Sequence, residues 1–210
     1  MSVVRLQAVE VDLGRTPVLT GVDLVIEAGE HVGIAGPNGA GKTTLLSVLA
    51  TLRAPSRGGG EILGARLDTD EIYAVRTRIG WSGHEAALYD ELTLRENLRH
   101  FCRLGGFGDT AADDALEQVG LARAADRLAR SCSNGMRRRA DLARLLVTRP
   151  SLLLLDEAQA GLDADAAVIV QALAARTLSA GGAVVAVSHD HAALEARTHR
   201  VLDLAAGELG

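Results

Sequence analysis

Aromatic residues are scarce in this chain of 210 residues: they make up 2% of it, and none occurs before Tyr73. Apolar residues nevertheless account for 48% and charged residues for 23%, an ordinary composition for a globular protein. We therefore expect a core built from Ala, Val, Leu and Ile. The length predicts one or two domains.

Cysteine is equally rare. The two cysteines, Cys102 and Cys132, are too few for a disulfide framework or a cysteine metal site, and they suit a reducing cytoplasm. Residues 1–5 lack the basic and apolar pattern of a signal peptide. No apolar run is long enough to span a bilayer. We expect the chain to serve a membrane only through a partner.

Excess positive charge is also missing, because the formal net charge is −5. Sequence-independent binding of nucleic acid relies on neutralising phosphates, so we expect no nucleic acid as a partner. One stretch is locally basic: it holds Arg137, Arg138 and Arg139, followed by Arg144 and Arg149. We expect these arginines on a solvated helix face or in interface ion pairs.

Strand and helix patterns alternate along the chain. Apolar alternation predicts strands within residues 3–35, the last of them short and buried at 31–35. Residues 43–52 read as a helix, 57–60 as a loop and 61–64 as a short strand. Towards the end, buried strands are expected at 152–155, 183–187 and 200–204, with a helix at 163–178. This order predicts an α/β fold with a parallel sheet.

The middle block, residues 90–130, is helical and charged. Thr93 can cap a helix that carries Leu94, Leu98 and Phe101 on one face, because Glu96 stands three residues after it. A second helix is expected from Asp109 or Thr110. We interpret the block as a small helical subdomain.

A phosphate-binding loop follows the strand at 31–35. Its residues are Gly36, Pro37, Asn38, Gly39, Ala40, Gly41, Lys42 and Thr43, with Thr44 starting the helix. Glycines let the backbone turn its N–H groups towards phosphate oxygens, and the helix offers its positive end to the same anion. Lys42 would reach the β and γ phosphates, and Thr43 would offer a hydroxyl to Mg²⁺.

Two carboxylates, Asp156 and Glu157, follow the apolar run 152–155. Ligands of open parallel sheets gather at the carboxyl ends of the strands. Asp156 is then placed to hold Mg²⁺ and Glu157 to polarise the attacking water. An Asp-Glu helix cap is the alternative if the pair is considered alone.

Residues 131–139 resemble the signature of the ABC ATPase family, whose usual form is Leu-Ser-Gly-Gly-Gln before a basic helix. Ser133 and Gly135 match it, whereas Cys132, Asn134 and Met136 depart from it. Ser133 is also an ordinary helix cap. Further matches follow in the order of the family: a D-loop at Ala160, Gly161, Leu162 and Asp163, and a switch histidine at His189 that would contact the γ-phosphate.

The resemblance covers nearly the whole chain. It implies a single nucleotide-binding domain over residues 1–210, with a P-loop core, an N-terminal antiparallel β subdomain and a helical subdomain at about 86–135. It also implies ATP and Mg²⁺ as cofactors and two domains stacked head to tail, so a second subunit is needed and a homodimer is favoured. The partner would be a separate transmembrane permease, with this chain peripheral on the cytoplasmic face of the membrane.

Two positions depart from the family. His84 stands where the family has a Gln that meets Mg²⁺ and water, and this resembles the ATP-binding subunit of the haem exporter of cytochrome c biogenesis. A tolerated substitution in another small drug-type or lipid-type exporter subunit is the alternative. Leu13 replaces the aromatic residue on which the adenine commonly stacks. We leave His31, His100, His191 and His199 on the surface.

The sequence thus predicts ATP hydrolysis that drives a membrane partner. A soluble ABC ATPase acting on DNA or ribosomes is a rival, but such proteins usually carry long coiled-coil inserts or two ATPase halves. A regulatory module without hydrolysis is disfavoured by intact Lys42, Asp156 and Glu157.

Overall fold

The computed structural model describes residues 1–83, 85–157 and 164–210. The chain forms two compact units. The first comprises residues 1–81, 150–157 and 177–210, and the second comprises 82–149 with the described part of 158–176. That the whole chain is one domain with a helical subdomain at about 86–135 stays a prediction.

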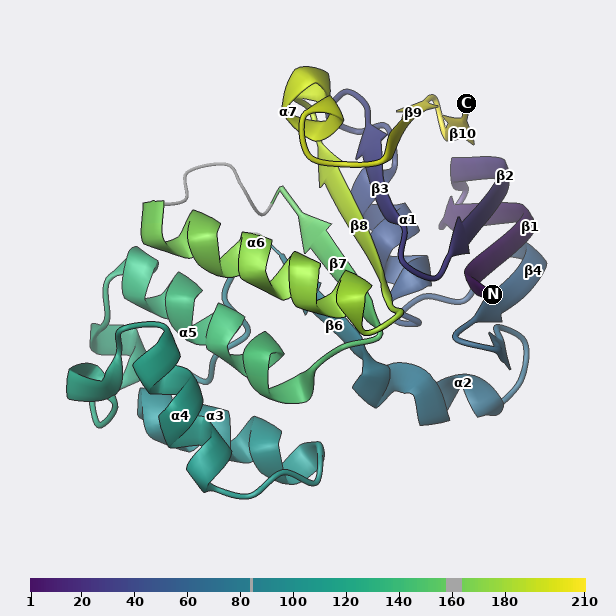
Figure 1. The fold of residues 1–210 in the computed structure, drawn as a ribbon. Coiled ribbons are helices and arrows are strands. Elements are labelled where there is room, and N and C mark those ends of the chain that lie inside the picture. The colour runs from purple at the N-terminus through teal and green to yellow at the C-terminus, as the bar shows by residue number, and fades with distance from the viewer. Residues whose placement is uncertain (84, 158–163) are drawn as a thin grey trace. The chain divides into compact units, whose positions relative to one another are not determined.

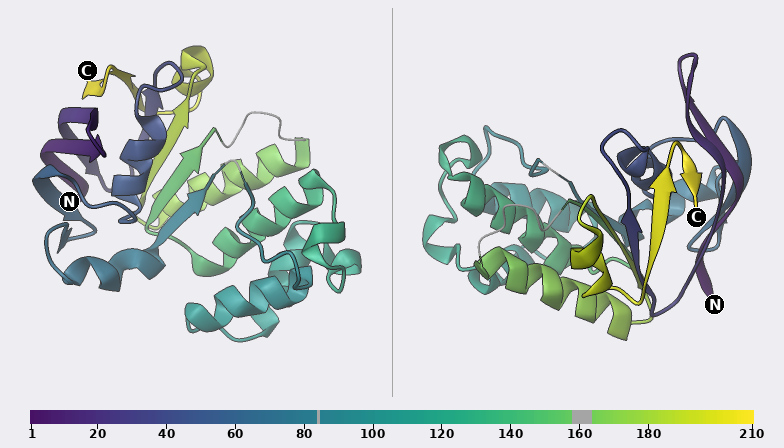
Figure 2. Two further views of the ribbon diagram at one scale, coloured as in Figure 1. Left: turned by 180° about the vertical axis from the view of Figure 1, so that it is seen from behind. Right: turned by 90° about the horizontal axis from the view of Figure 1, so that it is seen from above.

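A four-stranded antiparallel sheet forms the N-terminal part of the first unit, as expected from the apolar alternation. Its strand order is β2-β1-β4-β5. The strands are β1 (Ser2–Leu13), β2 (Thr16–Glu27), β4 (Arg57–Ile62) and β5 (Ala65–Arg66). The long pair of β1 and β2 is drawn in purple in the right-hand view of Figure 2.

The predicted loop at 57–60 is wrong, because these residues belong to β4 and pair with β1. Glycine suggested a loop, but here it permits close strand pairing. At Gly58 the backbone has φ +74°, and a Cβ would lie 2.1 Å from the carbonyl oxygen of Ala8. Only a residue without a side chain fits there.

The central sheet of the first unit has the order β10-β9-β3-β8-β7-β6. Strands β9, β3, β8 and β7 run parallel, and β10 is antiparallel to β9. The bounds are β3 (His31–Ala35), β6 (Ile79–Ser82), β7 (Leu152–Asp156), β8 (Ala183–Ser188), β9 (Arg200–Ala205) and β10 (Glu208–Leu209). All residues of β3 and β7 are buried, as is typical of a parallel sheet covered on both faces.

The short helices of the first unit are α1 (Lys42–Leu49), α2 (Glu71–Val75), the 3₁₀ turn η1 (Arg76–Arg78) and α7 (His191–Glu195). Figure 1 shows α1 next to the central sheet, and α1 contacts β7 and β2. One core cluster joins the side chains of α1 to both sheets through Leu45, Val32 and Ile26, among others. The core is aliphatic, as the scarcity of aromatic residues predicts.

The second unit is helical. Its elements are α3 (Leu94–Leu104), α4 (Thr110–Gln118), the 3₁₀ turns η2 (Ala122–Ala124) and η3 (Ala129–Ser131), α5 (Asn134–Thr148) and most of α6 (Ala164–Ser179). The left view of Figure 2 shows α3, α4 and α5 together. Thr93 forms the predicted capping box with Glu96, and Leu94 and Leu98 are fully buried.

Two expectations about surface residues hold only in part. His31 begins β3 between β8 and β9, so its side chain is only 7% exposed rather than on the surface; His100 is half-buried, whereas His191 and His199 are exposed. Arg137, Arg138 and Arg139 are half-buried rather than fully solvated, and their guanidinium groups donate to carbonyl oxygens within the second unit, whereas Arg149 is exposed. Interface ion pairs for this stretch stay a prediction.

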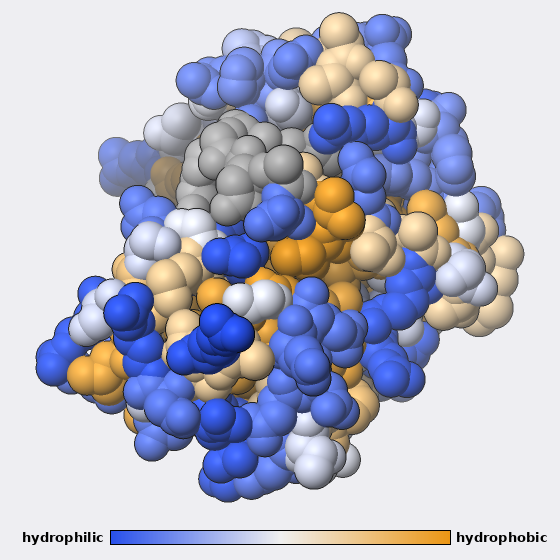
Figure 3. Space-filling view, turned by 60° about the vertical axis from the view of Figure 1, so that its left-hand side comes forward, coloured by the Kyte–Doolittle hydropathy of each residue, from blue (hydrophilic) through white to orange (hydrophobic). Residues whose placement is uncertain are grey.

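Both cysteines are free thiols. Within the described residues, the helices are all too short or too polar to cross a membrane. Hydrophilic residues predominate on the face drawn in Figure 3, and the hydrophobic ones gather towards its middle.

Candidate functional site

The candidate phosphate-binding loop leaves β3 and enters α1. Pro37, Asn38 and Gly39 are exposed, Gly36 is half-buried and Ala40 is buried. The helix begins at Lys42, directly after Gly41, whose φ of +104° suits glycine and whose absent Cβ would lie 2.9 Å from a methyl carbon of Leu19. The loop therefore presents backbone and the first turn of a helix to solvent.

The ammonium group of Lys42 lies inside this loop. Its side chain is nearly buried, and Nζ donates hydrogen bonds to the carbonyl oxygens of Gly36 at 2.7 Å and Pro37 at 3.0 Å. Thr43, exposed, and Thr44, half-buried, occupy the first turn of α1. A helix N-terminus next to a fixed ammonium is a site suited to a phosphate anion.

Asp156 and Glu157 lie where β7 ends. Asp156 is 4% exposed, and Glu157 has a left-handed backbone with φ 49°. A non-glycine residue in this region is uncommon and often marks a functional position. The N–H of Glu157 donates to the carbonyl oxygen of Val187 at 3.1 Å, which fixes the turn against β8.

The carboxylate of Glu157 is held by the end of β8. It accepts a hydrogen bond from the N–H of His189 at 3.1 Å, and the ring Nδ1 of His189 lies 3.2 Å from both carboxylate oxygens. The hydroxyl oxygen of Ser188 lies 3.5 Å from one of them. The side chain of His189 is 64% exposed and that of Glu157 only 11%. The imidazole therefore stands between the carboxylate and solvent.

Sequence reasoning gave Ser188 no role. The sequence did indicate a role for Ser188, because it is a polar residue at the end of an apolar strand and precedes His189.

The parallel register brings these groups to one edge of the sheet. Ala35 lies opposite Ser188, and Asp156 lies opposite Val187. The loop after β3, the carboxylates of Asp156 and Glu157 at the end of β7 and the histidine after β8 therefore all lie at the carboxyl ends of neighbouring strands. An anion-binding loop beside a positioned carboxylate is suited to the cleavage of a phosphate ester or anhydride by water.

The proposed magnesium ligands fit that ion chemically. Thr43 and Asp156 offer oxygen donors, which Mg²⁺ prefers. Among the described residues, no group of three His, Cys, Asp or Glu side chains could hold a metal alone. The pair therefore suits an ion whose other ligands are water and phosphate oxygens.

The signature residues begin α5 in the second unit. The hydroxyl of Ser133 caps the helix by accepting a hydrogen bond from the N–H of Met136 at 3.3 Å. Ser133 is exposed and Gly135 half-buried. The end of this 15-residue helix thus combines a hydroxyl with a positive dipole.

His84 and Asp163 lie outside the described residues. Both flanks of position 84 are held by α5: the Ser82 hydroxyl and the Ala87 N–H each donate to Asp141 at 3.2 Å, and Arg138 donates to the Gly83 carbonyl. Asp141 is fully buried and also pairs with Arg144. Asp141 was not among the predicted residues, although an acidic residue within an otherwise apolar helix face indicates a buried polar contact.

Comparison with known proteins agrees with this architecture. The ABC transporter family matches residues 19–160. The chain is 47% identical over 154 residues to the daunorubicin resistance ATP-binding protein DrrA3 of Streptomyces coeruleorubidus, which covers 71% of this chain and 48% of that protein. It is 37% identical to the cytochrome c biogenesis ATP-binding export protein CcmA of Nitrosomonas europaea over 90% of both chains. The chain thus spans about half the length of the daunorubicin resistance relatives.

Solved structures show the same fold. An ATP-binding subunit of an ABC transporter superposes with a TM-score of 0.89 at 26% identity, covering 99% of this chain and 89% of the other. The cassette MJ0796, in a dimeric post-hydrolysis state bound to ADP and Pi, gives a TM-score of 0.86 at 28% identity, covering 98% and 96%. The predicted P-loop fold of ABC type is therefore confirmed, and the chain belongs to the ABC transporter family as an ATP-binding cassette of the ATPase class.

Proposed function

We propose that this chain is the ATP-hydrolysing subunit of an exporter and that it drives a separate membrane subunit from the cytoplasmic face. The observation that carries the proposal is the Glu157 carboxylate held by His189 at the sheet edge that bears the phosphate-binding loop. A regulatory module without hydrolysis has no need for a positioned base beside a phosphate site.

The residues divide the work as follows. The loop amides and Lys42 bind the β and γ phosphates, and Thr43 and Asp156 would hold Mg²⁺, which neutralises phosphate charge. Glu157 accepts a proton from water as that water attacks the γ-phosphorus in line and the bond to ADP breaks. Because Nδ1 of His189 faces Glu157, its Nε2 is the ring atom left to contact the γ-phosphate.

Ser133 would act on the nucleotide of a second copy of the chain. It lies in a different unit from the phosphate-binding loop, and the chain carries one of each element. The dimeric structures of MJ0796 support a paired arrangement for this fold. His84 and Asp163 keep their proposed nucleotide contacts, and His84 its proposed contact with Mg²⁺.

The test replaces Glu157 by Gln, which keeps the shape and removes the base. We expect hydrolysis to fall by about 10²–10⁴, the usual scale for loss of a general base, while ATP binding persists. The control is Glu117→Gln, an exposed residue of α4 outside the site. Near-normal turnover by Glu157→Gln would contradict the assignment.

Two cargoes are supported by different observations. The match over 90% of both chains favours the export role in cytochrome c biogenesis, with haem as the proposed cargo. The higher identity, 47%, favours export of a drug such as daunorubicin. The membrane subunit that copurifies with the chain would be reconstituted with it in vesicles. Stimulation of ATP hydrolysis by haem or by daunorubicin then decides between them.

A further inference from the structure

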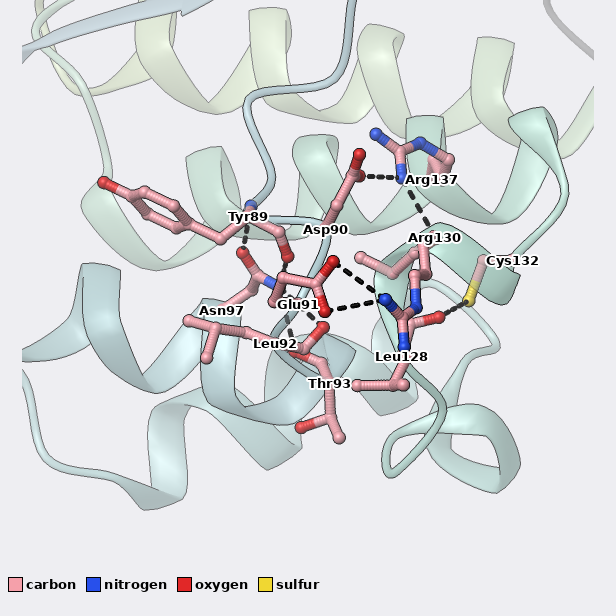
Figure 4. Close-up of polar contacts among 11 residues, drawn as sticks. Tyr89, Asp90, Glu91, Leu92, Thr93, Asn97, Leu128, Arg130, Cys132 and Arg137 are labelled. Carbon is pink, nitrogen blue, oxygen red and sulfur yellow. Dashed lines mark hydrogen bonds and ion pairs between the residues drawn. The ribbon is translucent and has the colours of Figure 1, made fainter.

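The segment that leads into the signature residues is hydrogen-bonded to residues 89–93, which precede α3 and are called the strap. The N–H of Ala129 donates to the Leu92 carbonyl at 2.9 Å, and the N–H of Arg130 donates to the Asp90 carbonyl at 3.2 Å. Figure 4 shows the strap and residues 128–132 side by side. The turn that ends at Ser133 therefore takes its position from the strap.

The strap itself is held by the fully buried side chain of Asn97 in α3. Its Oδ1 accepts the N–H of Tyr89 at 2.7 Å, and its Nδ2 donates to the carbonyls of Tyr89 at 3.0 Å, Thr93 at 2.9 Å and Leu92 at 3.3 Å. A buried amide with both its donor and acceptor groups engaged defines one backbone conformation, because any other would leave buried polar groups unpaired. Asn97 thus holds the strap in a single backbone conformation.

Arg137 connects the strap to both sides of the signature. From the first turn of α5, its Nη1 lies 2.5 Å from the Asp90 carboxylate and donates to the Ala129 carbonyl at 3.0 Å. Ala129 precedes Ser133 and Arg137 follows it. One guanidinium therefore fixes the two chain segments between which the Ser133 hydroxyl is presented.

Arg130 makes a contrasting contact. It pairs with both oxygens of Glu91 at 2.8 Å, but Glu91 is 74% exposed. Within the part of the chain that the structure describes, the Arg130 guanidinium makes no hydrogen bond or ion pair with α5. Solvent-exposed ion pairs of this kind contribute little to the stability of the fold. The chain therefore offers a neighbouring arginine that contacts the strap without spanning Ser133.

We propose that Arg137 is a positioning residue, which holds the Ser133 hydroxyl and the N-terminus of α5 in the geometry needed to bind the γ-phosphate on a second copy of the chain. The inference rests on the proposed function of Ser133. The helix dipole and the hydroxyl act only at short range, so a small displacement of this end weakens the contact. Neither Arg137 nor Asp90 belongs to the hydrophobic core of the unit, so the loss of their ion pair leaves that core intact.

The experiment uses the full chain in the Glu157→Gln background, where bound ATP persists. Dimer formation with and without ATP is measured by sedimentation, and nucleotide affinity by titration of a fluorescent ATP analogue at a concentration where the chain is monomeric. We expect Arg137→Gln to weaken ATP-dependent dimerisation by about tenfold, the scale of one charge-assisted hydrogen bond, with nucleotide affinity of the monomer unchanged.

Arg130→Gln, with the same change of charge, should dimerise like the parent. Asp90→Asn should weaken ATP-dependent dimerisation, as Arg137→Gln does. Arg137→Lys should retain part of the dimerisation that Arg137→Gln loses. Equal dimerisation of the Arg137→Gln and Arg130→Gln proteins would overturn the inference. If the Glu157→Gln parent itself shows no ATP-dependent dimer, the proposed function of Ser133 is wrong and this inference fails with it.

Discussion

At the scale of single residues, the carboxyl edge of the central sheet combines one buried ammonium with one restrained carboxylate. Lys42 donates to its own loop, and Glu157 accepts from His189. Both side chains are therefore preorganised: Lys42 to bind a phosphate and Glu157 to bind a water molecule. The proposed phosphate contacts therefore have residues in place to make them, whereas position 13 offers the base of the nucleotide no aromatic ring.

We predict loose selection of the nucleotide base. Leu13, at the end of β1, is 43% exposed and offers apolar surface but no ring. Stacking on an aromatic ring is worth roughly 1–3 kcal/mol, so GTP should be used within about tenfold of ATP, a window of roughly 1.4 kcal/mol. Comparing kcat/KM for ATP and GTP tests this.

A second variant sharpens that test. Leu13→Tyr should tighten ATP binding, and Leu104→Tyr, at another exposed leucine, should not. A preference of the parent for ATP far above a hundredfold would show that another residue selects the base.

His31 predicts a pH dependence of stability. Burial, and then the neighbouring His199, lowers the pKa of His31 to about 4. In the unfolded chain, this histidine binds its proton near pH 6.5. The contribution of the neutral His31 side chain to the free energy of unfolding is therefore fully present above that pH and is lost as the pH falls towards about 4. The loss amounts to about 3 kcal/mol when complete.

The measurement is urea unfolding at pH 7.5 and pH 5. His31→Phe should reduce the difference in unfolding free energy between the two pH values, whereas Leu104→Phe, at an exposed position without a titratable group, should leave it unchanged. An undiminished difference in His31→Phe would assign the effect to other groups.

At the scale of elements, β4 depends on glycine. We predict that Gly58→Ala lowers the unfolding free energy by about 1–3 kcal/mol or more, because its Cβ would meet the Ala8 carbonyl and its backbone is left-handed. Gly59→Ala is the matched control, since nothing lies within 4 Å of its Cβ. Equal unfolding free energies for the two variants would contradict this account of the strand.

At the scale of the whole molecule, we predict that two chains share their nucleotide sites. Ser133→Arg and Lys42→Ala proteins should each be inactive, but their mixture should recover part of the ATPase activity, because each mixed dimer keeps one site with an intact loop and an intact signature.

Mixing Lys42→Ala with Glu157→Gln provides the control. Lys42 and Glu157 belong to the same unit, so both sites of that mixed dimer are damaged and activity should stay low. Provided that mixed dimers are demonstrated, a Ser133→Arg mixture no more active than its components would exclude shared sites.

The sequence alone determined the elements that are local. The loop at 36–43, the carboxylates at the end of β7 and the Thr93 cap are contiguous patterns, and each requires only its own neighbours to form. The order of strands and helices followed from the same periodicity, so the α/β class could be predicted. The roles of the site residues stay predictions.

The tertiary structure decided what depends on distant partners. Residues 57–60 became a strand because β1 offered a pairing edge, and His31 was buried because β8 and β9 flank it. Arg137 turned inward because Asp90 and Ala129 supply acceptors. Glycine, histidine and arginine each occur in several structural environments, so the neighbouring sequence did not determine which environment these residues would occupy. Their environment was determined by the hydrogen-bonding groups of distant segments that the fold placed next to them.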